Sequence, residues 1–168
     1  MRTFVAFATL VLFFSPAITA QEAEVDVKEL LTEFGQRVDT DGVNIMLVHL
    51  NDFTTDYFFT APSKYALRAQ ARQQTMFYVT GSAVDTHEVR LDFELRQSNP
   101  QGHRLFSGQT INIQNFEEGS VVDGGEEFSG IVAFDADWRV PGRLAIANGD
   151  HIFSFEFNRN TLAKLGGS

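Results

Sequence analysis

From residue 76 onward the sequence is made of short apolar or alternating stretches separated by turn residues, and this pattern restricts the chain to a β fold. The clearest stretch runs from Val89 to Arg96, where apolar and charged residues alternate as they do in a strand with one buried face. Turns are predicted at residues 99–102 and 148–150, since glycine permits the positive φ that tight turns need. About seven such strands, separated by turns, are typical of a β-sandwich or barrel.

The predicted strands differ in their degree of burial. Residues 128–134 are largely apolar on both faces, which favours a buried strand. The stretch from Phe106 to Asn115 is expected to form a single strand with Ile111 and Ile113 on the same face. In full, the predicted strands are residues 43–50, 76–84, 89–95, 106–115, 128–134, 144–147 and 151–157.

Two segments have a helical pattern instead. From Asp26 to Val38 apolar residues recur at spacings of three and four, which predicts an amphipathic helix of about three turns that ends near Gly42. Residues 63–74 are rich in Ala, Arg, Gln and Leu, which are good helix formers. Residues 51–65 are mixed in composition, and the sequence assigns them no element.

The first twenty residues have the pattern of a secretory signal peptide. Arg2 is followed by an apolar run from Phe4 to Phe14 and by small residues from Ala17 to Ala20, so we expect cleavage before Gln21. The apolar run is about 11 residues, shorter than the roughly 20 that cross a bilayer, and a retained anchor is therefore the weaker alternative. We expect no stable membrane insertion after cleavage and a periplasmic or secreted location.

Removal of 20 residues from a chain of 168 leaves 148, enough for one domain with its own core. The sequence divides into a signal peptide (1–20), an N-terminal helical segment (21–41), a β-sandwich domain (42–160) and a C-terminal tail (161–168). The chain has no cysteine, so its stability must come from packing, and the 13 of its 17 Phe residues that follow residue 20 supply the apolar area. Loss of Arg2 from a chain of net charge −9 leaves a charge of −10, and we expect no nucleic-acid partner.

Two stretches carry a family resemblance. The run from Met76 to Val84, followed by Val89 to Leu95 and the turn at residues 99–102, resembles the early strands of an immunoglobulin-like β-sandwich family of unknown function, found in exported bacterial proteins and lipoproteins. The run from Gly124 to Phe134 resembles that family's Gly-Glu-x-x-x-Gly-x-x-x-Phe stretch. The resemblance covers residues 42–157. It implies a mainly β protein, an immunoglobulin-like antiparallel β-sandwich with a short N-terminal amphipathic helix, acting as an extracytoplasmic interaction or accessory domain.

A short basic ridge is predicted on the second helical segment. Lys64, Arg68 and Arg72 are spaced four apart, so a helix aligns them on one face. Such a ridge on an acidic protein suits an acidic partner or a phosphate. A solvated helix face is the simpler interpretation.

Aromatic residues are a second candidate contact group. Phe53, Tyr57, Phe58, Phe59 and Tyr65 are close in sequence, and rigid rings provide contact area at low entropic cost. They line a ligand pocket or a partner-binding patch, or they belong to the core. The lone Trp138 is expected to be exposed and a further contact, because Asp137 and Arg139 flank it in a predicted turn before Pro141.

The sequence has no motif of a nucleophilic hydrolase. It lacks both Gly-x-Ser-x-Gly and cysteine, which argues against serine or cysteine nucleophiles. Acidic residues such as those at 117–118 and 126–127 could supply a carboxylate pair for glycoside hydrolysis, although the chain is small for such an enzyme. We therefore assign no catalytic residue and expect no enzymatic activity.

No metal site is predicted either. The four histidines do not have zinc-ligand spacing, and His49 and Met46 would point to opposite faces of a strand. We expect the histidines to be ordinary surface or strand-end residues. Asp135 and Asp137 have an alternate spacing that suits a calcium loop, but a solvated acidic loop is the simpler interpretation. No cofactor or metal ligand is assigned.

Three functional hypotheses follow. The first is a non-catalytic extracytoplasmic binding or accessory module that uses edge strands and end loops to contact a protein or envelope component. The second is a carrier of a small apolar ligand in a Phe-lined cavity. The third is a small carboxylate-based hydrolase. Oligomeric state is not predicted.

Overall fold

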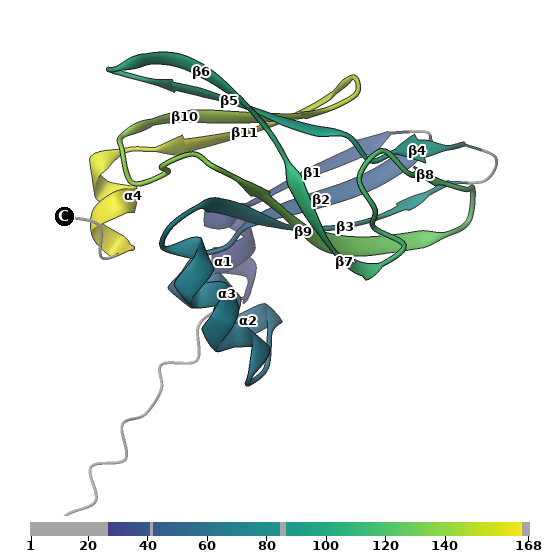
Figure 1. The fold of residues 1–168 in the computed structure, drawn as a ribbon, viewed down its shortest axis with the longest axis horizontal. Helices are drawn as coiled ribbons and strands as arrows, with labels where there is room; N and C mark the ends of the chain where they lie inside the picture. The colour runs from purple at the N-terminus through teal and green to yellow at the C-terminus, as the bar shows by residue number, and fades with distance from the viewer. Residues whose placement is uncertain (1–26, 41, 85–86, 166–168) are drawn as a thin grey trace, which may run out of the picture.

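The computed structural model describes residues 27–40, 42–84 and 87–165, which fold as a two-layer antiparallel β-sandwich (Figure 1). One layer is a five-stranded sheet with the order β1-β2-β3-β9-β7, and the other is a four-stranded sheet with the order β11-β10-β5-β6. A short pair, β4 with β8, lies beside them. The predicted class, a mainly β, immunoglobulin-like antiparallel sandwich, is confirmed.

The bounds of the elements are as follows. The five-stranded sheet contains β1 (Gly35–Thr40), β2 (Val43–His49), β3 (Thr75–Ala83), β7 (Gln109–Gln114) and β9 (Glu127–Phe134). The four-stranded sheet contains β5 (Phe93–Asn99), β6 (Gly102–Ser107), β10 (Gly142–Asn148) and β11 (His151–Phe157), and the short pair is β4 (Val89–Arg90) and β8 (Val121–Val122). The helices are α1 (Val27–Phe34), α2 (Asp52–Phe58), α3 (Ser63–Ala71) and α4 (Arg159–Lys164).

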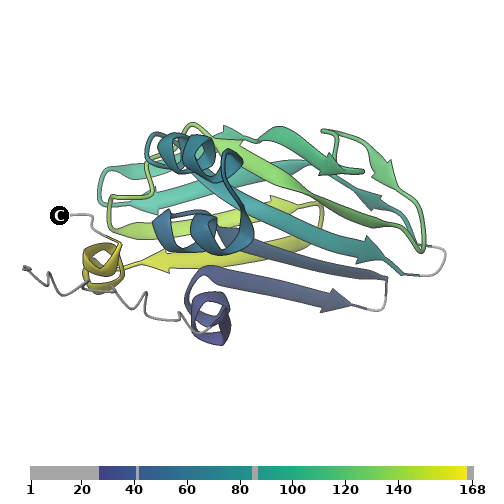
Figure 2. The same cartoon turned by 90° about the horizontal axis from the view of Figure 1, so that it is seen from below.

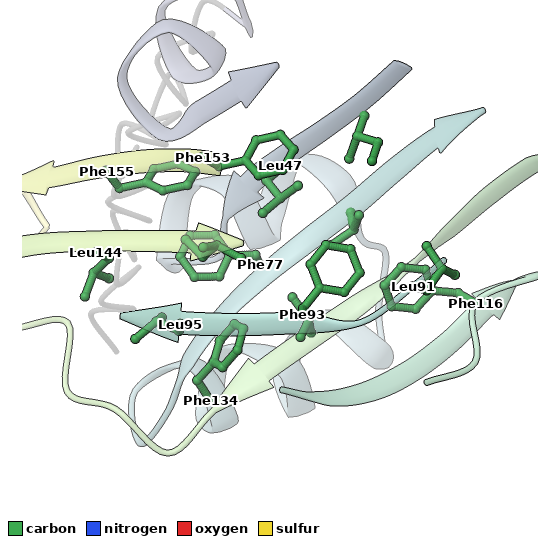
Figure 3. Close-up of a cluster of buried hydrophobic side chains, with 14 of the residues drawn as sticks. Leu47, Phe77, Leu91, Phe93, Leu95, Phe116, Phe134, Leu144, Phe153 and Phe155 are labelled. Carbon is green, nitrogen blue, oxygen red and sulfur yellow. The ribbon is translucent and has the colours of Figure 1, made fainter. Parts of the chain in front are cut away.

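Phenylalanine rings occupy the space between the two sheets (Figure 3). The Phe77 ring lies 4.9 Å from that of Phe155, across the sandwich, and 6.3 Å from that of Phe134, measured between centroids. The Phe116 ring lies 5.8 Å from that of Phe93. Full burial of such a side chain stabilises a fold by roughly 1.5–3 kcal/mol, so this packing accounts for the high Phe content.

The predicted alternation of buried and exposed side chains from Val89 to Arg96 is confirmed, although these residues do not form one strand. Val89, Leu91 and Phe93 are buried and the charged residues between them are exposed. The chain changes partners at Leu91, because β4 pairs with β8 whereas β5 pairs with β10.

The prediction of a single strand from Phe106 to Asn115 is wrong. Gly108 divides it into β6 and β7, which belong to different sheets. A Cβ at Gly108 would lie 2.5 Å from Cγ2 of Val132, so a glycine is required where the chain crosses between the sheets. Ile111 and Ile113 do share a face, and both are exposed.

The helix expected from Asp26 to Val38 is too long. It ends at Phe34, and Gly35–Thr40 forms β1, which pairs with β2. A Cβ at Gly35 would lie 2.6 Å from the Leu31 carbonyl oxygen, and the glycine therefore lets the chain turn sharply into the strand. The amphipathic character is confirmed, since Leu30 and Phe34 are buried against Val48 of β2. Residue 26 and the predicted signal peptide lie outside the described residues.

Helices α2 and α3 form a third layer over one end of the outer face of the five-stranded sheet (Figure 2). The sequence assigned nothing to residues 51–65, yet α2 starts with a capping box in which the Asn51 side chain accepts from the Thr54 backbone and the Thr54 side chain accepts from the Asn51 backbone. The helix predicted over 63–74 is confirmed as α3, although it ends at Ala71, three residues earlier than predicted. At the other end of the chain, α4 was not predicted, and it buries Leu162 against the sandwich.

His49 is the last residue of β2, in agreement with the strand-end alternative, but it is fully buried on the inner face of the strand and is not a surface histidine. Its ring meets the rings of Phe157, Trp138 and Phe77 edge-on, with centroids 4.8, 5.0 and 5.4 Å away. Neither ring nitrogen has a hydrogen-bond partner among the described residues. Burial lowers the pKa of His49 to about 3. Met46 packs on the opposite face of β2, as predicted.

This burial predicts a specific pH dependence of stability. Below about pH 6.5 the unfolded chain binds a proton at His49 and the folded chain does not, so the free energy of unfolding falls by about 1.4 kcal/mol per pH unit as the pH drops toward about 3. Urea unfolding measured between about pH 6.5 and 5, above the range in which most carboxyls titrate, isolates this contribution. The slope should be lost in His49→Phe and retained in His103→Ala, whose side chain is exposed. Equal slopes in the wild type and His49→Phe would contradict the assignment.

Candidate functional site

A polar, concave surface lies where the β5–β6 hairpin meets the β9–β10 connection. These two segments lie at the left end of the sandwich in Figure 1. Its volume is about 330 Å³. We call it the end pocket, and its polar lining includes Gln73, Gln97, Asn99, Gln101, Arg104 and Asp135. Phe106 and Val140 add apolar surface to the wall.

The end pocket exists because the inward-facing residues of β5 change from apolar to polar. Phe93 and Leu95 point into the core, and by strand periodicity Gln97 and Asn99 point the same way. Opposite Gln97, Arg104 of β6 is in register. The space between the layers is therefore lined by hydrogen-bonding groups at this end, and the sequence signal that marks it is the polar residue at position 97.

Hydrogen bonds hold one wall of the pocket, the 135–141 loop, in place. The Thr75 hydroxyl donates to the Ala136 carbonyl (2.7 Å), and Nε2 of Gln97, a side chain that is only 5 % exposed, donates to the Asp137 carbonyl (2.6 Å). The Trp138 indole N–H donates to the Ala71 carbonyl at the end of α3 (3.1 Å). Since three different elements fix the loop, the pocket is preorganised for binding.

The charged groups of the pocket fall into two kinds. Asp137 accepts hydrogen bonds from the backbone N–H and Nε of Arg139, at 3.0 and 2.8 Å. Partial burial alone would raise the pKa of Asp137, but the hydrogen bonds and charge of Arg139 together lower it. Arg104 and Asp135, in contrast, have neither an ion pair nor a side-chain hydrogen bond within the described part of the chain.

The expected exposure of Trp138 is wrong. The side chain is 7 % exposed, and its ring packs on His49 and Phe157 at 5.0 and 5.9 Å. Its charged neighbours Asp137 and Arg139 do lie at the surface, where they form a salt bridge with each other. Trp138 is therefore the anchor of the 135–141 loop.

The basic ridge of Lys64, Arg68 and Arg72 is aligned on α3 as predicted, and it faces two aspartates of α2. Lys64 Nζ lies 3.6 Å from Asp56 and the Arg72 guanidinium 2.7 Å from Asp52. Arg68 contacts both carboxylates. The ridge thus has an acidic partner in its own chain. The missed signal is the spacing of Asp52 and Asp56, which are also four apart.

The aromatic group around residue 57 divides into two sets. Phe58 and Phe59 pack on Tyr78 of β3 at 5.2 and 5.6 Å and attach α2 to the sheet. Tyr57 is 49 % exposed and rests on Phe58, while Tyr65 is 60 % exposed with Lys64 Nζ 5.4 Å from its ring centre. A partner-contact role for Tyr57 stays a prediction.

Within residues 27–40, 42–84 and 87–165, no three His, Asp or Glu side chains are grouped so as to hold a metal ion. None of the helices described for this chain combines the length and apolar character of a bilayer-crossing segment.

The fold and pocket define the class of protein as an antiparallel β-sandwich with a polar end pocket. No protein-family model matches the chain, and no curated protein matches it. Among solved structures, it is similar to MPT63, described as a secreted protein from Mycobacterium tuberculosis, with a TM-score of 0.36 and 16% identity over 73% of this chain and 92% of that one. It is also similar to a DUF4426 family protein from Pseudomonas aeruginosa PAO1, with a TM-score of 0.35 and 13% identity over 74% of this chain and 94% of that one. Similarities this low assign neither a family nor a function.

Trp138 provides the first prediction from the site. Trp138→Phe leaves the Ala71 carbonyl without its donor and should lower the free energy of unfolding by about 1–3 kcal/mol, while Trp138→Ala also removes ring packing and should cost about 3–5 kcal/mol. Urea unfolding followed by circular dichroism measures both. Tyr65→Phe is the matched control at an exposed ring and should stay within about 0.5 kcal/mol of the wild type. A Trp138→Ala variant as stable as this control would contradict the anchoring role.

The ion pairs between α2 and α3 provide a second prediction, which concerns the salt dependence of stability. Asp56→Asn removes the partner of Lys64 and one partner of Arg68, and it should lower the free energy of unfolding by about 0.5–1 kcal/mol at low salt. At about 1 M salt the difference should shrink, because the Debye length is then only about 3 Å. Asp39→Asn, which breaks the isolated surface pair with Arg37, is the control and should have a smaller effect. A loss independent of salt would argue against an electrostatic cause.

Proposed function

We propose that the protein is a non-catalytic extracytoplasmic binding or accessory module that contacts a protein or envelope component through the end pocket. The observation that carries this proposal is the convergence, on one concave surface, of four side chains that make no hydrogen bond within the described residues. They are Gln73, Gln101, Arg104 and Asp135. Polar groups gathered in a pocket without internal partners are available to a ligand.

The extracytoplasmic location is supported by the signal-peptide pattern of the first twenty residues. The absence of cysteine is compatible with export, since the Phe core stabilises the sandwich without disulfides.

Asp137, one of the two carboxyls that line the pocket, is unsuited to act as a general acid. A general acid of the carboxyl type needs a raised pKa, whereas Asp137 has a lowered one because Arg139 binds it. The interior of the sandwich is occupied by Phe rings that pack on one another, which favours this proposal over the carrier of an apolar ligand.

Site-specific cross-linking tests the proposal in the organism of origin. A photo-reactive amino acid placed at Gln101, on the pocket rim, should form a discrete adduct with an envelope protein or other envelope component. The matched position is Asp150, in the β10–β11 turn at the opposite end of the four-stranded sheet, which should give none. Adducts of equal yield from both positions, or from neither, would refute the pocket as the contact surface. Accumulation of the unprocessed chain in the cytoplasm would refute the extracytoplasmic role.

A further inference from the structure

The end pocket carries one positive and one negative group that do not neutralise each other. Arg104 belongs to β6 in the four-stranded sheet, and Asp135 follows β9 of the five-stranded sheet, so they come from the two layers of the sandwich. Both line the same pocket, yet no ion pair joins them or ties either to another of the described residues. Asp137 is already paired with Arg139, which leaves the pocket with one available charge of each sign.

Carboxamides surround these two charges. Gln97 uses its Nε2 for the Asp137 carbonyl, and Asn99 uses its Oδ1 for the Gln101 backbone N–H, so an acceptor on Gln97 and a donor on Asn99 remain. Gln73 and Gln101 add complete carboxamide groups. A carboxamide presents the same donor and acceptor as a peptide group, and the lining is therefore suited to hydrogen-bond a polypeptide backbone.

We infer that the end pocket binds a short peptide segment that carries both a carboxylate and an ammonium group. This inference rests on the proposed function and names its ligand class. The guanidinium of Arg104 holds the carboxylate through its fork of N–H donors, Asp135 holds the ammonium, and the carboxamides bind the peptide groups between them. The volume of about 330 Å³ admits a few residues at most.

Nuclear magnetic resonance of the exported, processed protein tests this directly. The probes are glycine, diglycine and triglycine, which carry the two charges at increasing separation because each residue adds at most about 3.6 Å. The side-chain signals of Gln73, Gln97, Asn99 and Gln101 and the Nε–H of Arg104 should shift on titration at millimolar concentration. One peptide length should bind best, since the positions of the two charges are fixed. N-acetyl-triglycine amide, which lacks both charges, should bind at least about tenfold more weakly than triglycine.

Variants then assign the charges. Arg104→Gln and Asp135→Asn should each weaken binding of the best zwitterion at least about tenfold. Binding of the blocked peptide should not change. Arg96→Gln and Asp150→Asn, at exposed positions outside the pocket, are matched controls and should bind as the wild type does. Unchanged backbone signals away from the pocket show that each variant is folded.

Three results would overturn the inference. The first is that no zwitterion shifts the pocket signals, and the second is that the blocked peptide binds as tightly as triglycine. The third is that maltose, a neutral disaccharide, shifts these signals while the peptides do not, which would assign the pocket to saccharides. A specific adduct at Gln101 together with any of these results would leave the proposed function standing and reject the peptide ligand alone.

Discussion

Packing of phenylalanine rings between two antiparallel sheets is the interaction on which the rest of this structure depends, because the chain has no cysteine to supply disulfides. Phe77 of one sheet and Phe155 of the other meet across the sandwich, and Phe93 and Phe116 extend the same contact network. The apolar layer ends on β5 between Leu95 and Gln97. The extent of the core therefore decides where the sandwich opens and where a polar pocket forms.

Local patterns in the sequence predicted much of the fold. Two-residue alternation, glycine turns and the apolar run at 128–134 are sufficient to predict the sandwich, and their strands appear in the structure. The errors at Gly108 and Gly35 have a common cause, since both depend on contacts between residues distant in sequence. The division at Gly108 depends on Val132 and Phe93, because the side chain of the first blocks a Cβ at this glycine and the carbonyl of the second binds its N–H. At Gly35 the helix ends because β1 pairs with β2, which a helical period does not reveal.

The site was harder to predict than the fold for the same reason. Trp138 has charged neighbours that suggested exposure, but its own environment is set by His49 and Phe157, far away in the sequence. The basic ridge was correctly placed on a helix, and only the packing of α2 beside α3 revealed its acidic partners. The end pocket combines residues from the α3–β3 connection, the β5–β6 hairpin and the β9–β10 loop, so no single stretch of sequence contains its pattern.

The hydrogen bond from Trp138 to the Ala71 carbonyl also joins two layers of the molecule mechanically. The connection that follows α3 supplies Gln73 to the end pocket, and Ala71 at the end of α3 supplies the acceptor that holds the 135–141 loop. A shift of α3 relative to the sheet must therefore either break this bond or carry the 135–141 loop with it. The hydrogen bond therefore couples the position of the helical layer to that of the 135–141 loop, one wall of the end pocket.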